Sequence, residues 1–168
     1  MLTTNIPEWV ASSDNLCHLL DKKLTSSNDF FISLSSGRKI DVPFPSNQLY
    51  ECLWDCHEPD LQGSIKLEQA ARLAEFIKDR RSKQQNLWVN CQAGISRSGA
   101  IVDILLRLGW TEHKHRHQET RFPNPTVWYA VAQFFPELEG QHPPYRTGEE
   151  WDDAIYLYLN PQQKRYFK

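Results

Sequence analysis

The sequence has no apolar run that approaches the length needed to span a membrane, and its N-terminus lacks the basic-then-apolar pattern of a signal peptide. The chain also lacks a large excess of either sign of charge. Its 19 basic and 21 acidic residues give a formal net charge of −2, so no global attraction to nucleic acid or to an anionic membrane is expected. The four cysteines form no regular framework, which suits a reducing compartment. These absences predict a cytoplasmic protein with no membrane partner, and they make a nucleic-acid partner a poor fit.

The length and the composition indicate a single domain. The chain has 168 residues, of which 40% are apolar and 24% charged, as in an ordinary soluble protein with one compact core. No repeat, linker or low-complexity tract interrupts it. We expect one domain over residues 1–168, with a core at about residues 28–136 and a helical C-terminal extension at about residues 137–168.

Strand-like and helix-like segments alternate along the chain. Runs rich in β-forming residues predict four strands, the second joined to the first through Ser36-Gly37; they are Phe30–Leu34, Lys39–Val42, Leu49–Trp54 and Leu87–Val89. Apolar residues at helical spacing, or a capping box, predict helices at residues 67–77, 100–106 and 127–134 and after residues 147–150. This order predicts an α/β fold with a largely parallel central sheet flanked by helices.

The stretch from Asn90 to Gly99 lies between a predicted strand and a predicted helix. A loop in this place can turn its amides inward as an anion nest, and the helix dipole adds partial positive charge. Gly94 allows the backbone to approach a ligand closely. The stretch therefore predicts a phosphate-binding loop, whose residues are Gln92, Ala93, Gly94, Ile95, Ser96 and Arg97.

Three side chains of this loop predict its chemistry. Cys91 is the candidate nucleophile, and the positive field of the loop and the helix favours its thiolate form. Arg97 can hold two phosphate oxygens in a bidentate fork. Ser98 can donate a hydrogen bond to the sulfur and ease its departure from a phosphoenzyme. The alternative interpretation is a buried structural cysteine before a helix, with Arg97 on the surface.

These residues predict phosphoryl transfer in two steps, through a phosphocysteine that water then hydrolyses. A leaving phenoxide or alkoxide needs a proton, so a carboxylic acid is expected over the loop, and the resulting carboxylate can activate the water. Asp55 is favoured because it begins a polar segment after an apolar run. Asp60 is the alternative, and Glu58 is a weaker candidate. The chemistry requires no metal or other cofactor.

The segment Cys91–Gly99 resembles the signature loop of the protein tyrosine phosphatase superfamily, Cys-x5-Arg-Ser/Thr, as worded in small dual-specificity-like phosphatases of bacteria and phages. Arg121–Asn124 is similar to the Arg…Pro-Asn segment that follows the loop in dual-specificity phosphatases. Asp55–Pro59 resembles an Asp-x-x-Glu-Pro segment before their first long helix. The resemblance covers roughly Phe30–Phe135 and implies the dual-specificity phosphatase fold and activity. It also implies that the aspartate of the Asp55–Pro59 segment is the general acid.

One position departs from that family. The residue before the nucleophile is usually a histidine, which is expected to orient the loop and to favour the thiolate, but here it is Asn90. An asparagine can hydrogen bond but cannot carry charge. We therefore expect Asn90, together with Asn124, to act as a supporting residue. The same departure leaves a phosphate-binding pseudophosphatase module as an alternative from another functional class.

The loop also restricts the substrate. Arg97 is its only cation, which disfavours a polyphosphorylated head group. We expect a phosphorylated protein as the partner, with phosphotyrosine, or else phosphoserine or phosphothreonine, as the substrate. The alternative within the same chemistry is a small phosphomonoester, namely a nucleotide, an RNA end or a phosphometabolite.

Two clusters outside the loop have competing interpretations. Cysteine and histidine residues that could be imagined as zinc ligands lack paired Cys-x2-Cys spacing, so ordinary core and loop residues are expected; they are Cys17, His18, Cys52, Cys56 and His57. A reversible disulfide between Cys56 and Cys91 is a further alternative. The basic run His113–His117 is expected to form a solvated face. Its alternative role is to steer anionic substrates, more strongly when its histidines are protonated.

Overall fold

The computed structural model describes residues 5–6, 28–37, 39, 41–42, 44–56, 62–91, 96–112 and 122–144. In chain order the strands are β1 (Asn5–Ile6), β2 (Asp29–Ser35), β3 (Gln48–Cys52), β4 (Asn86–Cys91) and β5 (Thr111–Glu112). The helices are α2 (Leu67–Ser82), α3 (Arg97–Arg107) and α4 (Pro125–Ala132), with short 3-10 turns at Pro45–Asn47 and Pro136–Leu138. Among these residues, no helix combines the length and the apolar character needed to cross a membrane.

The central sheet is parallel, as predicted. Its strand order is β3-β2-β4, and both pairings of β2 are parallel. In this register Leu34 lies beside Cys91 and Ser35 lies beside Cys52. The carboxyl ends of all three strands therefore meet at one edge of the sheet, where ligands of α/β proteins commonly bind. β1 and β5 form a separate parallel pair of two residues each.

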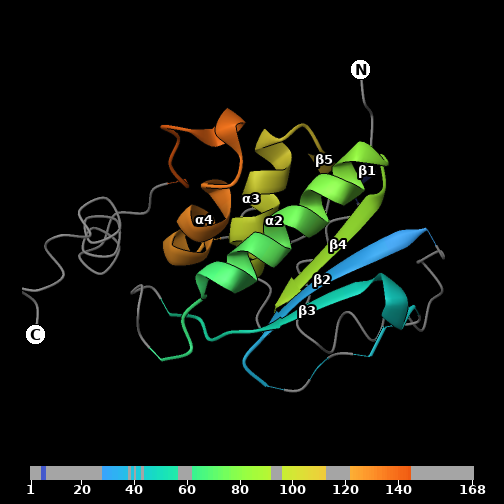
Figure 1. Cartoon of the computed structure of the whole chain (residues 1–168), viewed down its shortest axis with the longest axis horizontal. Helices are drawn as coiled ribbons and strands as arrows, with labels where there is room; N and C mark the ends of the chain where they lie inside the picture. Colours follow the sequence, from blue (N-terminus) through green and yellow to red (C-terminus); the bar gives the residue numbers. More distant parts are fainter. Residues whose placement is uncertain are drawn as a thin grey trace, which may run out of the picture.

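Three helices lie together against one face of this sheet (Figure 1). On α2 the buried positions recur at helical spacing, at Ala70, Leu73, Ala74 and Ile77. Alternate residues of the strands face these helices, and Leu87, Val89 and Cys91 of β4 belong to the core beneath them. The other residues of the strands form the opposite face, where Phe31 stacks on Trp88 with ring centroids 6.4 Å apart.

Two predicted elements need correction, and one lies outside the described residues. The strand expected at Lys39–Val42 is wrong, because Lys39, Asp41 and Val42 lie in no strand. The predicted turn at Ser36-Gly37 therefore leads into no second strand there, and this segment belongs to the longer connection between β2 and β3, which are parallel. β3 ends at Cys52, two residues before the predicted end. The capping box and helix expected after residue 146 lie outside the described part of the chain.

Candidate active site

Cys91 is the last residue of β4, and its side chain is almost fully buried beneath α3. Its Sγ lies 3.1 Å from the Oγ of Ser98, which is in the first turn of that helix and is also buried. The strand and the helix thus bring together the two residues that the sequence predicts as nucleophile and sulfur partner. A hydroxyl at this distance can donate to a thiolate and lower the energy of the charged sulfur.

Arg97 begins α3, yet only 3% of its surface is exposed. One terminal nitrogen, Nη1, donates a 2.6 Å hydrogen bond to the backbone carbonyl of Leu53, the residue that follows β3. Among the described residues, its Nε has no hydrogen-bond partner and no carboxylate pairs with the guanidinium. Burying a charge is costly unless it is paired, so this arginine is suited to receive an anion.

Asp55 lies at the same edge of the sheet, three residues after β3, and is exposed. Its Oδ1 accepts hydrogen bonds from Ser96 Oγ at 2.7 Å and from Asn124 Nδ2 at 2.8 Å. Ser96 precedes α3 as its N-cap, but its side chain does not cap the helix and turns to Asp55 instead. The predicted acid is therefore in direct contact with the predicted phosphate loop.

Asn124 connects three segments and is fully buried. Besides Asp55, its Nδ2 is 3.0 Å from the carbonyl oxygen of Cys56, and its backbone N–H donates to the carbonyl of Ser96 at 3.0 Å. Its Oδ1 accepts from the backbone N–H of Val127 at 3.0 Å and so caps α4. One asparagine thus fixes the acid segment, the end of the phosphate loop and the start of a helix relative to one another.

Asn90 points to the other face of the sheet from its neighbour Cys91, as alternation along a strand requires. Its Oδ1 accepts a 2.8 Å hydrogen bond from Ser33 Oγ, which in turn accepts one of 3.0 Å from Gln48 Nε2. Asn90 and Ser33 are both buried, and Asn90 Nδ2 has no partner among the described residues. These hydrogen-bonded side chains tie β4 to β2 and β3 behind the candidate nucleophile.

Comparison with known proteins gives only distant likenesses. A scan against protein-family models finds no match, and a search of curated proteins finds none either. The Orf virus protein OH1, a tyrosine phosphatase, is a similar solved structure, with 14% identity over 96% of this chain and 84% of its own and a TM-score of 0.45. Human DUSP28 has 14% identity over 93% and 90% of the two chains, with a TM-score of 0.45. PTPMT1 in complex with PI(5)P has 15% identity over 79% and 92%, with a TM-score of 0.44.

Likenesses at these identities and TM-scores carry no information about the activity or the substrate of this chain. Its chemistry has to follow from the residues of the loop and of the sheet edge.

Some predicted site residues lie outside the described part of the chain. Four of them belong to the loop, namely Gln92, Ala93, Gly94 and Ile95, so the anion nest stays a prediction. The roles suggested for the alternative acids, Glu58 and Asp60, and for the basic run His113–His117 also stay predictions. No disulfide bond links Cys52, Cys56 or Cys91 within the described residues. Within the described ranges, no three His, Cys, Asp or Glu side chains gather as a metal site would require.

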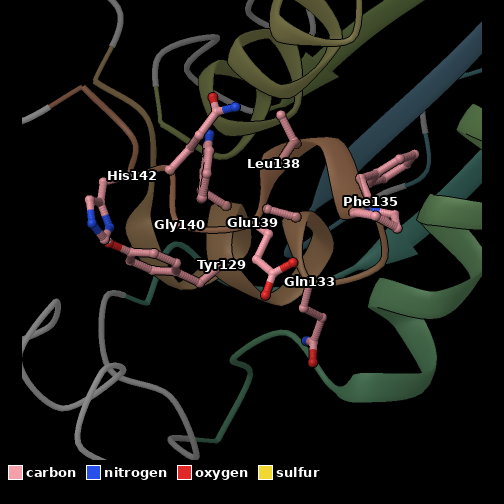
Figure 2. A pocket seen from close by; sticks show the side chains of 11 residues that line it. Tyr129, Gln133, Phe135, Leu138, Glu139, Gly140 and His142 are labelled. Carbon is pink, nitrogen blue, oxygen red and sulfur yellow. Dashed lines mark hydrogen bonds between the residues drawn. The ribbon is translucent and has the colours of Figure 1, made fainter.

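A cavity of about 660 Å³ lies apart from this site, along α4 and the turn that follows it. Figure 2 shows Tyr129, Phe135, Leu138 and His142 among the side chains that line it, with Tyr129 and His142 directed toward each other. The Tyr129 hydroxyl is 2.8 Å from His142 Nδ1, and burial raises the pKa of Tyr129. None of the candidate catalytic residues lines this cavity, so its size has no bearing on the phosphate site.

The sequence did not single out Ser33, Gln48 or the carbonyl of Leu53. A signal existed for Ser33, because it is a polar residue at an interior position of an otherwise apolar strand. The bond from Arg97 to Leu53 had no such signal, since it involves a backbone atom 44 residues away.

Proposed function

We propose that this protein is a cysteine-dependent phosphatase. It hydrolyses phosphomonoesters on proteins, namely phosphotyrosine or else phosphoserine and phosphothreonine, through a phosphocysteine intermediate. The observation that supports this most strongly is the buried, incompletely paired Arg97 next to the Cys91–Ser98 pair, at the end of β4 and the start of α3. A structural cysteine would not need a buried guanidinium that lacks a carboxylate partner within the described chain.

In the first step the Cys91 thiolate attacks phosphorus in line with the leaving oxygen. The P–S bond forms as the bond from phosphorus to the ester oxygen breaks, and that oxygen takes a proton from Asp55. Arg97 is held at one end by Leu53, which leaves its Nε available to an equatorial phosphate oxygen. Such fixed donors stabilise the charge that develops in the transition state.

In the second step the Asp55 carboxylate takes a proton from water, and the water oxygen attacks phosphorus. The P–S bond breaks, inorganic phosphate is released, and the sulfur leaves as a thiolate. Ser98, 3.1 Å from the sulfur, is placed to donate a hydrogen bond to it as its charge returns. Asp55 regains in this step the proton that it lost in the first, so the cycle closes without a metal.

The geometry around Asp55 agrees with both of its roles. Ser96 and Asn124 bind one carboxylate oxygen, Oδ1, and so fix the group beside the loop. The side chain is nevertheless exposed, so a leaving group and a water molecule can reach it. The hydrogen bond from Ser96 also links the acid to the last residue of the loop before Arg97.

The direct test measures phosphate release from phenyl phosphate in the presence of EDTA. Wild type is expected to be active, Cys91→Ser to be inactive, and Asp55→Asn to be slowed on the order of 10²-fold or more, as for the loss of a general acid. Cys56→Ser serves as a matched control, because it changes a neighbouring free thiol that has no part in the steps above. Full activity in Cys91→Ser would contradict the proposal. Normal rates in Asp55→Asn with a strong loss in Asp60→Asn would transfer the acid role to Asp60.

A phosphate-binding module is the second candidate, and Asn90 is the observation that favours it. The group behind the nucleophile is a neutral amide bound to Ser33, so it adds no positive charge to favour the thiolate. Wild-type protein that binds vanadate or phosphate in an Arg97-dependent way, but releases no phosphate from any monoester, would establish this function in place of the enzyme.

A further inference from the structure

Trp54 is one of two large apolar side chains that are exposed among the described residues, with 53% of its surface accessible. Its two neighbours in the chain both contact the phosphate-loop region. The carbonyl of Leu53 binds Arg97 at 2.6 Å, and the carboxylate of Asp55 binds Ser96 at 2.7 Å. Because consecutive Cα atoms are about 3.8 Å apart, the indole of Trp54 starts beside the candidate catalytic acid.

The indole is held in place by a glycine. The backbone N–H of Trp54 donates a 2.7 Å hydrogen bond to the carbonyl of Gly63, which has a φ of +87°. A Cβ atom at Gly63 would lie 2.7 Å from Cγ of Trp54 and 2.8 Å from its Cδ2. The ring therefore rests directly on the bare Cα of Gly63, which only glycine permits at this distance and this φ.

The side chains of Trp54 and Asp55 are both exposed, although the two residues are consecutive. In regular extended backbone, successive side chains point to opposite faces, but here Leu53 is buried while the next two side chains are both exposed. An aromatic ring is thus exposed one residue before the exposed candidate acid. One part of the ring is covered by Gly63, and the remainder is free to meet a ligand.

We propose that Trp54 binds the aromatic ring of the substrate's leaving group, so that the site prefers aryl phosphates such as phosphotyrosine to alkyl phosphates. This inference rests on the proposed function, because it assumes that the phosphate occupies the Cys91 loop. Aromatic rings attract each other in offset or edge-to-face arrangements, with centroids about 4.5–7 Å apart. A phosphoserine or phosphothreonine side chain offers no ring for such a contact.

Binding of two unreactive probes tests the inference without turnover. Phenylphosphonate carries a ring, and methylphosphonate does not. Compared with wild type, Trp54→Ala is expected to weaken phenylphosphonate binding about 10-fold and Trp54→Phe about 2- to 3-fold, with methylphosphonate unchanged in both. Leu67→Ala, at the other exposed apolar residue, is the matched control and should change neither. Equal weakening of both probes in Trp54→Ala would overturn ring binding.

Kinetics with a phosphotyrosine peptide and a phosphoserine peptide of otherwise identical sequence give a second readout. Trp54→Ala should raise KM for the phosphotyrosine peptide about 10-fold and leave its kcat, and both constants for the phosphoserine peptide, unchanged. A fall in kcat on both peptides would mean that Trp54 acts only by positioning Asp55, which contradicts the inference. A nucleoside monophosphate preferred over the phosphotyrosine peptide would also overturn it, in favour of nucleobase stacking.

Failure of the inference and failure of the proposed function give different results. If wild type releases no phosphate but Trp54→Ala weakens the binding of phenylphosphonate and leaves that of methylphosphonate unchanged, the hydrolysis proposal is overturned and ring binding is supported. If wild type is active but Trp54→Ala treats the two phosphonates as wild type does, ring binding is overturned and hydrolysis stands.

Discussion

The candidate nucleophile and the candidate acid are assembled in different ways at the same edge of the sheet. The nucleophile corner, formed by Cys91, Arg97 and Ser98, comes from one stretch of chain across the end of β4 and the start of α3, and all three side chains are buried. The acid corner, formed by Asp55, Ser96 and Asn124, comes from three segments, and its carboxylate is exposed.

Because of this difference, the two corners depend on different interactions: the nucleophile corner on core packing and the acid corner on side-chain hydrogen bonds. The nucleophile corner is fixed by a strand and a helix that pack into the core, so few single side chains can displace it. The acid corner is fixed by two hydrogen bonds to Asp55 Oδ1, one of which spans 69 residues of sequence. Changes at Asn124 and Ser96 should therefore damage proton transfer and leave attack by the thiolate intact.

Two substrates distinguish the corners. Phenoxide leaves phosphorus poorly without a proton, whereas p-nitrophenoxide is stable as an anion and needs the acid much less. The kcat/KM value reports the first chemical step, so acid-corner variants should lose kcat/KM for phenyl phosphate and keep it for p-nitrophenyl phosphate. Nucleophile-corner variants should lose both.

Arg97→Lys, in the nucleophile corner, should have the largest effect among variants that retain the sulfur and the acid. The substitution keeps the charge but loses the planar fork and the bond geometry to Leu53, so kcat/KM should fall on the order of 10³-fold for both substrates. Steady-state kinetics with the two phosphate esters measures it. A loss confined to phenyl phosphate would place Arg97 with the acid instead, and the division into two corners would then be wrong.

Asn124 should give the next largest effect, and two variants separate its two roles. Asn124→Ala removes both the anchor of Asp55 and the cap of α4, so we expect a loss of about 30- to 100-fold on phenyl phosphate and about 1 kcal/mol of stability. Asn124→Asp keeps a good cap residue but cannot donate to Asp55 and sets a like charge beside it. The aspartate variant should therefore lose at least as much activity and, although it keeps a cap residue, also more stability, measured by urea unfolding, because a buried carboxylate would face Asp55 and the carbonyl of Cys56. Equal stability losses with normal activity would show that Asn124 is only a helix cap.

Ser96→Ala should have a smaller effect, about 10-fold on phenyl phosphate and little on p-nitrophenyl phosphate. It removes one of the two hydrogen bonds to Asp55 Oδ1 but leaves the other. Ser96→Thr retains a hydroxyl and is the matched control, expected within about 3-fold of wild type. Loss on both esters in Ser96→Ala would assign Ser96 to phosphate binding and not to the acid.

Ser33→Ala should have the smallest effect on catalysis. It breaks the link from Gln48 to Asn90 on the opposite face, so kcat/KM should fall by only about 2- to 3-fold, and on both esters alike. The larger consequence is a stability loss of about 1–3 kcal/mol, because a buried amide oxygen loses its donor. A large activity loss with unchanged stability would mean that the Asn90 amide contributes directly to the reactivity of Cys91.

The two corners also differ in how far the sequence predicts them. Cys91, Arg97 and Ser98 could be found because they lie within eight residues, between a strand pattern and a helix pattern that the structure confirms. Asp55 could be proposed from its place after an apolar run, but its contacts with Ser96 and Asn124 depend on tertiary packing that no local pattern encodes. The connection between β2 and β3 had a similar limit, since Ser36-Gly37 resembles a turn into a strand at Lys39–Val42, and the structure has no strand at Lys39, Asp41 or Val42.

The support behind Cys91 shows the same limit. The change from a charged to a neutral residue at Asn90 was visible in the sequence, but its partner Ser33 is 57 residues away on a neighbouring strand. Register brings Ser33 beside Asn90, and register is decided by the whole sheet rather than by either segment. The role of Trp54 likewise depends on Gly63, which approaches it only because the chain returns toward α2.

The central claim is a covalent phosphocysteine at Cys91, and Asp55→Asn is the variant in which to trap it. With p-nitrophenyl phosphate the first step needs little acid, while the second step lacks its base, so the intermediate should accumulate. Mass spectrometry after an acid quench, with peptide mapping, measures it. The account predicts a phosphoryl group on the peptide that contains Cys91, absent from Cys91→Ser. Continued release of p-nitrophenol by wild type, with no adduct in Asp55→Asn or with the phosphoryl group on another residue, would contradict it.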